Sequence, residues 1–111
     1  MDEDQSAARF VAVADRIVER APVPIDMIGA SLIAGIHLNV GSDSRSLANK
    51  LGLAHALVLR EITTLSDRFL TVTKRDSRTQ RSFLLLTPEG EALAQAAAGL
   101  VLEPSLSREA I

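Results

Sequence analysis

The stretch from Ser44 to Arg81 restricts the fold of this chain more than any other. It begins with a short segment of helical periodicity that ends at Gly52, and a longer helical segment follows directly. An alternating apolar run then leads into a basic loop and a second apolar run. A helix, a turn, a second helix and a hairpin in that order predict a mainly α chain with one small β-hairpin.

Two further helices are predicted before this stretch. Residues 4–20 carry apolar side chains at three- and four-residue spacing, which is typical of an amphipathic helix. Pro22 and Pro24 end it, because proline cannot continue a helix. Residues 25–38 are apolar nearly all round, which indicates a central, buried helix.

The turn between the next two helices has clear local signals. Ser44 is the predicted N-cap of a helix that runs to about Leu51. Gly52 supplies the left-handed turn that ends it. Residues 54–68 form the following helix, whose inward stripe consists of Val58, Ile62 and Leu65.

The hairpin and the last helix complete the pattern. Residues 69–73 and 82–86 are predicted strands, and residues 74–81 are the basic loop between them. Thr87 is a predicted N-cap, and Pro88 suits the first position of a helix over residues 88–103. We therefore expect a single domain over residues 1–111. Its winged helix-turn-helix core, residues 25–87, is flanked by the two terminal helices.

Composition excludes several classes of protein. The chain of 111 residues has no cysteine, so disulfides and cysteine metal sites are excluded, which fits a reducing cytoplasm. The acidic N-terminus lacks the basic and apolar blocks of a secretory signal. The most apolar run, residues 25–40, contains Asp26 and is shorter than the roughly 20 residues that span a membrane. We expect a cytoplasmic protein that has no membrane partner.

Charge is distributed unevenly along the chain. Residues 44–82 contain eight bases and three acids, a net charge of +5, whereas the remainder has four bases and eleven acids, a net charge of −7. A basic segment between acidic ends is what a phosphate-facing surface would look like, although loops and solvated helix faces are also charged. On a winged helix-turn-helix, this set of bases favours double-stranded DNA as the partner. The predicted DNA-contacting residues are Arg45, Lys50, His55, Leu57, Arg60, Arg68, Lys74, Arg75, Arg78 and Arg81.

The motifs of this stretch resemble the MarR family of winged-helix transcriptional regulators. The resemblance rests on Leu47-Ala48-x-x-Leu51-Gly52-Leu53, on Asp76, Arg78 and Arg81 in the hairpin, and on Leu86-Thr87-Pro88-Glu89-Gly90. It implies a homodimer built from the terminal helices, with residues 54–68 in the major groove and the arginines of the 74–81 wing at the minor groove or backbone. It also implies that a small-molecule effector is an option.

Other functions have less support in the residues. The apolar stripe of the first helix could pack on its own domain or against a partner subunit. Together, the stripes at residues 7–18 and 93–101 lead us to expect a homodimer. Leu57 and Leu59, if exposed, would instead favour a winged-helix module that binds another protein and has little or no affinity for DNA. Two isolated histidines and the absence of a glycine-rich phosphate loop give no basis for an enzyme, a metal site or a cofactor.

Overall fold

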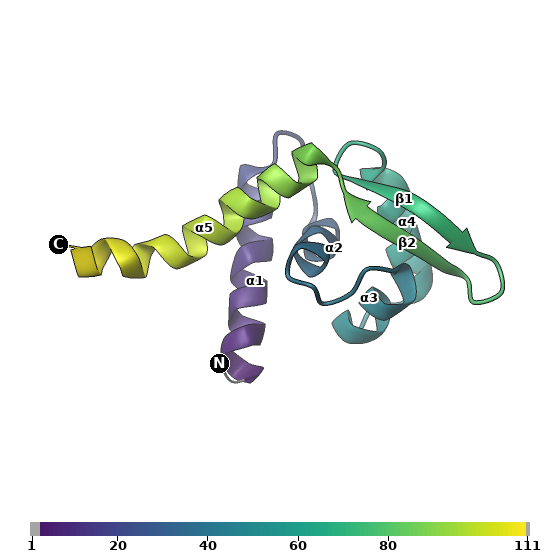
Figure 1. The fold of residues 1–111 in the computed structure, drawn as a ribbon, viewed down its shortest axis with the longest axis horizontal. Coiled ribbons are helices and arrows are strands. Elements are labelled where there is room, and N and C mark those ends of the chain that lie inside the picture. Colours follow the sequence, from purple (N-terminus) through teal and green to yellow (C-terminus); the bar gives the residue numbers. More distant parts are fainter. Residues whose placement is uncertain (1–2, 111) are drawn as a thin grey trace.

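The computed structural model describes the backbone of residues 3–110 and the side chains of residues 6–100. In chain order the elements are α1 (Glu3–Arg20), α2 (Met27–His37), α3 (Ser44–Leu51), α4 (His55–Leu65), β1 (Leu70–Asp76), β2 (Arg81–Leu86) and α5 (Pro88–Ala110). Figure 1 shows α3, α4 and the β1–β2 hairpin together at one end of the molecule, with α1 and α5 at the other. This is the predicted winged helix-turn-helix with flanking helices.

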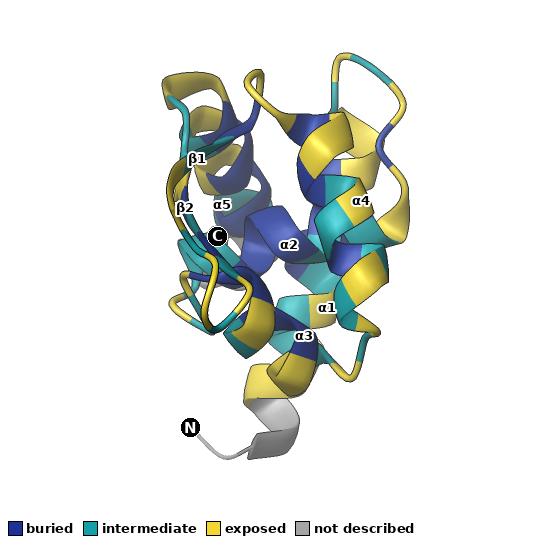
Figure 2. Ribbon diagram, turned by 90° about the vertical axis from the view of Figure 1, so that its right-hand side faces the viewer, coloured by how far each residue is buried: buried dark blue, intermediate teal, exposed yellow. Residues whose placement is uncertain are grey.

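Helix α2 lies at the centre of the core. Its residues Leu32, Ile33 and Ala34 are fully buried, and Figure 2 shows the helix enclosed by the other elements. Gly35 allows α3 to approach, because a Cβ atom there would lie 2.9 Å from a methyl carbon of Leu47. Each large apolar side chain buried in this way contributes about 1.5–3 kcal/mol to stability.

The two terminal helices pack against each other and against α2. Val13 and Ile17 of α1 are fully buried, as are Ala94 and Ala97 of α5. The apolar stripes at residues 7–18 and 93–100 are therefore largely explained by packing within one chain, and residue 101 of the predicted stripe lies outside the described side chains. On α1, the large apolar side chains that stay exposed are Val11 and Val18, at 53% and 38% of their surface.

The helix-turn-helix differs from the prediction at both ends. Asp43, not Ser44, is the N-cap of α3, since its Oδ2 atom accepts hydrogen bonds from the backbone N–H groups of Arg45 and Ser46, each 3.0 Å long. Gly52 has a positive φ of 69°, as predicted.

Helix α4 ends at Leu65 rather than near residue 68. The Ser66 hydroxyl donates a 2.8 Å hydrogen bond to the carbonyl of Ile62, while the Ser66 backbone is extended. Such a bond from a side chain to the backbone competes with continuation of the helix. The chain then turns directly into β1.

The hairpin is longer and its loop shorter than the predicted loop over residues 74–81. Strand pairing extends to Asp76 opposite Arg81, so that only residues 77–80 form the turn. The Asp76 carboxylate tightens this turn by accepting a 3.0 Å hydrogen bond from the Arg78 N–H. A bulge at Thr73 shifts the register between Val72 and Lys74.

Helix α5 begins as predicted and ends later. The Thr87 hydroxyl accepts a 3.0 Å hydrogen bond from the Gly90 N–H and donates one of 2.6 Å to the Arg68 carbonyl. The helix was expected to end at residue 103, but its backbone continues through Pro104 to Ala110. Proline removes one N–H donor from a helix without always ending it.

Candidate nucleic-acid interface

The outward face of α4 is built around Arg60. Val58, Ile62 and Leu65 are buried at helical spacing, which turns Ala56, Arg60 and Thr63 toward solvent. The Thr63 hydroxyl donates a 3.2 Å hydrogen bond to the carbonyl of Leu59, so its remaining lone pairs are free to accept. A long guanidinium between two small side chains can enter a groove without steric hindrance.

The two leucines of α4 do not form an exposed apolar patch. Leu57 is half-buried, and Leu59 packs against the core. Leu59 also lines a cleft of about 240 Å³ between α4 and the turn of the hairpin, together with Arg75 and Gln80. The feature that would favour a protein partner on this helix is therefore weaker than the sequence indicated.

His55, at the start of α4, takes part in a buried junction. Its Nε2 atom lies 2.9 Å from the Oγ atom of Ser44, and the same hydroxyl accepts a 3.0 Å hydrogen bond from the Ser82 N–H. Burial, followed by the nearby charge of Arg45, lowers the pKa of His55. Because Ser44 is fully buried, this serine–histidine pair joins α3, α4 and β2 and leaves no accessible nucleophile.

Asp43 links α3 to the hairpin. Its Oδ2 atom accepts a 2.9 Å hydrogen bond from the guanidinium of Arg81, which also reaches the Ser46 hydroxyl at 3.3 Å. Burial opposes the charge of Asp43, but the hydrogen bonds from Ser46 and the charge of Arg81 outweigh it and hold its pKa below the usual value. Arg81, a predicted DNA contact, therefore forms an ion pair with Asp43 of the same chain.

A second link joins the hairpin turn to α3. The Nε atom of Arg45 donates a 2.9 Å hydrogen bond to the Thr79 carbonyl. Arg68 is similarly engaged, because its Nε atom lies 3.1 Å from a carboxylate oxygen of Glu89 and its guanidinium lies over the ring of Phe69. These pairs are exposed, so each contributes little stability, but they determine where the arginines lie.

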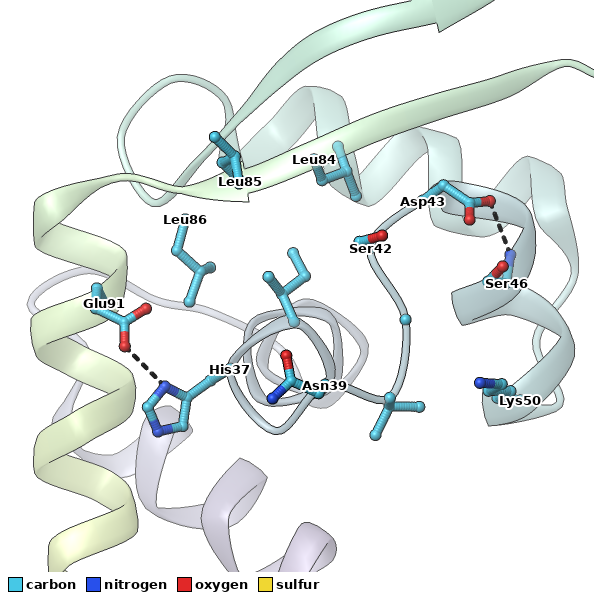
Figure 3. A pocket seen from close by; sticks show the side chains of 13 residues that line it. His37, Asn39, Ser42, Asp43, Ser46, Lys50, Leu84, Leu85, Leu86 and Glu91 are labelled. Carbon is cyan, nitrogen blue, oxygen red and sulfur yellow. Dashed lines mark hydrogen bonds and ion pairs between the residues drawn. The ribbon is translucent and has the colours of Figure 1, made fainter.

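The remaining predicted contacts fall into two groups. Lys74, Arg75 and Arg78 are exposed on the hairpin and, like Arg60, form no ion pair among the described side chains. Lys50 lies apart from them and lines a pocket beside α2 (Figure 3). Ala56 and Thr63 share the exposed face of Arg60, since they are four and three residues away from it along the helix.

A pair of carboxyl groups joins α4 to the start of α2. Asp26 caps α2 by accepting a 2.8 Å hydrogen bond from the Gly29 N–H, and Glu61 of α4 lies beside it. Burial, followed by the charge of Asp26, raises the pKa of Glu61. A carboxyl group with a raised folded-state pKa stabilises the fold below its unfolded-state pKa. This contribution to the free energy of unfolding is lost as pH rises through the folded-state pKa.

We expect Glu61→Gln to increase the free energy of unfolding at pH 7 by roughly 0.5–1 kcal/mol, because a neutral amide removes the repulsion from Asp26. The gain should disappear below about pH 4.5, where Glu61 is protonated in the folded and unfolded states. Urea unfolding at both pH values measures it, with Asp15→Asn on the exposed face of α1 as the control. Destabilisation of Glu61→Gln at pH 7 would contradict this reading.

Within residues 3–110, no helix has the length and apolar character needed to cross a membrane. The described side chains contain no group of three or more histidine, aspartate or glutamate residues that could hold a metal ion.

Comparison with known proteins supports the fold. No protein-family model matches the chain, and no curated protein matches it. Among solved structures, it is similar to NadR in complex with 4-hydroxyphenylacetate, with a TM-score of 0.63 and 22% sequence identity. The match covers 96% of this chain and 74% of that one. NadR is a MarR-family regulator, so the likeness shows a MarR-like winged-helix fold.

Proposed function

We propose that this chain is a DNA-binding transcriptional regulator of the MarR type, and that α4 enters the major groove. The observation that carries the proposal is the outward face of α4, where Arg60 lies between Ala56 and Thr63. An arginine between small residues suits contact with guanine in a groove that is wide enough for a helix. Helix α4 and the hairpin lie at the same end of the molecule (Figure 1).

The N-terminal end of α4 also supports entry of this helix into the major groove. Its N-cap, Ala54, offers no side-chain hydrogen bond, so the first N–H groups of the helix keep their capacity to donate. An uncapped helix N-terminus attracts phosphate through these donors and through the helix dipole. The exposed cations of the hairpin, Lys74, Arg75 and Arg78, would neutralise further phosphates at the backbone or the minor groove.

A homodimer is part of the proposal. Ala7, Val11 and Val18 lie on one exposed stripe of α1, which a second copy would cover together with α5. Such a dimer would present two α4 helices to half-sites about one helical turn apart.

A small-molecule effector also belongs to the proposal. NadR was solved in complex with 4-hydroxyphenylacetate, a small aromatic carboxylate. We propose that a ligand of this chemical class regulates the present chain.

A selected-oligonucleotide profile tests the proposal most directly. We expect a near-palindromic site bound at moderate salt by a species with the mass of two chains. Arg60→Ala should reduce the preference for that site over random duplex by roughly tenfold, because one base contact contributes about 1–3 kcal/mol of discrimination. Arg20→Ala, on α1, is the control. If neither heparin nor mixed duplex DNA retains the protein in a salt-dependent way, the proposal is wrong.

A further inference from the structure

The Ser44 hydroxyl links the three segments that form the proposed DNA-binding end of the molecule. Ser44 is the first residue of α3 and is fully buried. Its Oγ atom lies 2.9 Å from the Nε2 atom of His55, the first residue of α4. The same oxygen accepts a 3.0 Å hydrogen bond from the backbone N–H of Ser82 in β2. One side chain therefore connects both helices of the helix-turn-helix to the hairpin, at one end of the molecule (Figure 1).

The direction of the bond between His55 and Ser44 follows from the number of donors and acceptors. A hydroxyl group has one proton to donate, and the Ser82 N–H already occupies one lone pair of the Ser44 oxygen. Among the described residues, the Nε2 atom of His55 is the acceptor within hydrogen-bond distance of that proton. A buried donor without an acceptor is costly. The neutral imidazole therefore accepts at Nε2 and carries its own proton on Nδ1.

Proton uptake by His55 is incompatible with this arrangement. The imidazolium carries an N–H group on both ring nitrogens, so Nε2 becomes a donor and the bond to Ser44 reverses. The Ser44 oxygen would then accept from His55 and Ser82 together, while its own buried proton would lose its acceptor. The junction can restore a partner for that proton only by separating α4 from β2.

The surroundings of His55 also oppose a proton on its ring. From α3, Arg45 repels the imidazolium and Asp43 attracts it, and the Asp43 carboxylate is shared with Arg81 of β2. On α4, the side chains one turn away are apolar, and the helix dipole opposes a positive charge at the N-terminus. Burial, followed by the charge of Arg45, holds the pKa of His55 below its ordinary value of 6.5.

We propose that the Ser44–His55 pair positions α4 against the hairpin only while His55 is neutral, and that proton uptake by His55 loosens this junction. His55, which the sequence predicts as a DNA contact, is then a positioning residue that acts through Ser44 and Ser82. The loosening is a property of the folded chain alone. Its consequence, weaker binding to DNA at acidic pH, rests on the proposed function.

The first test uses NMR on the free protein between about pH 7.5 and about pH 5. We expect the ring resonances of His55 to titrate below pH 6.5, with the ring proton on Nδ1 at higher pH. The protection factor of the Ser82 amide in hydrogen exchange should fall at least about threefold as His55 becomes charged. A group with a lowered folded-state pKa loses its stabilising contribution as pH falls through that pKa, so both changes should share one midpoint.

His55→Gln and His37→Gln form a matched pair, because they change the two histidines of the chain in the same way. Glutamine at position 55 can still form a hydrogen bond with Ser44 but takes up no proton, so the protection of the Ser82 amide should no longer depend on pH. His37 pairs with Glu91 of α5 rather than with Ser44. Its replacement should leave the pH dependence of the Ser82 amide unchanged.

The second test measures the affinity for duplex DNA over the same pH range. Relative to His55→Gln, the affinity of the unmodified protein and of His37→Gln should fall at least about threefold from about pH 7.5 to about pH 5. A histidine that contacted phosphate directly would have the opposite effect, because its positive charge would strengthen binding as pH falls. The sign of the pH dependence therefore separates a positioning role of His55 from a contact with DNA.

Three results would overturn the inference. One is a His55 ring that stays neutral down to about pH 5. Another is a Ser82 amide whose protection factor is constant while His55 titrates. The third is an affinity for DNA that rises, relative to His55→Gln, as pH falls. If no duplex binds the protein, the proposed function fails, and the NMR titration still decides whether the junction responds to protons.

Discussion

Replacing Gly90 with alanine is expected to lower the free energy of unfolding by about 3 kcal/mol or more, since overpacking at a rigid site usually costs 1–3 kcal/mol. A Cβ atom on Gly90 would lie 1.9 Å from the carbonyl oxygen of Phe69 and 2.8 Å from its carbonyl carbon. Both are backbone atoms, so no side-chain rotation can relieve the overlap. Thermal unfolding should show a decrease of more than about 10 °C.

The corner around Phe69 cannot move away easily. The Thr87 N–H donates a 3.0 Å hydrogen bond to the same Phe69 carbonyl, and the Thr87 hydroxyl holds the carbonyl of Arg68. Separating Gly90 from Phe69 would break the contact between the start of α5 and the start of β1. The substitution should therefore disturb the hairpin as well as α5.

Gly99 supplies the matched control, because it lies in the same helix and receives the same substitution. A Cβ atom there would meet nothing within 4 Å among the described atoms. Gly99→Ala should stabilise the protein by roughly 0.5–1 kcal/mol through the higher helix propensity of alanine. If both variants shift the unfolding transition in the same direction, the close contact at Gly90 is not the determining factor.

The combined substitution Arg75→Gln and Arg78→Gln is expected to weaken binding to every duplex by at least about tenfold at low salt. Both arginines are exposed on the hairpin and form no ion pair among the described side chains, so folding should be unaffected. The slope of log K against log salt should become shallower by about 2 for each bound chain, since two phosphate contacts are lost.

A double variant with the same change of net charge distinguishes direct contact with phosphates from overall electrostatic attraction to DNA. Arg16→Gln combined with Arg20→Gln removes two cations from the exposed face of α1 and should leave the salt slope nearly unchanged. Fluorescence anisotropy over a series of salt concentrations measures the affinity for duplex DNA and its salt slope for both double variants. An equal loss of affinity in the two double variants would mean that the hairpin does not contact phosphates.

Local features of the fold could be predicted because each depends on a few neighbouring residues. Gly52 adopts a positive φ, Thr87 caps α5 and the apolar stripe of α4 faces the core, all as expected. The N-cap of α3 could not be decided in the same way. Asp43 and Ser44 are adjacent and both suit a cap, and only the position of Arg81 shows why the aspartate takes the role.

The site was harder to predict because it depends on distant residues. Arg45, Arg68 and Arg81 look equivalent to Arg75 in the sequence, yet each of the three is bound to a group at least 21 residues away. Charge alone could not distinguish a cation that forms no ion pair from one that holds the hairpin. In the same way, an apolar stripe on α1 indicates burial without showing that α2 and α5 of the same chain both pack against it.

The links from α3 to the hairpin have an entropic consequence. Arg81 is held by Asp43, and Arg45 is held by the carbonyl of Thr79 in the turn itself. A β-hairpin without these links would lose conformational freedom on binding DNA, and its affinity for DNA would be lower for that reason. Here that loss is incurred during folding, so under the proposed function the hairpin would meet DNA already ordered and at a fixed distance from α4.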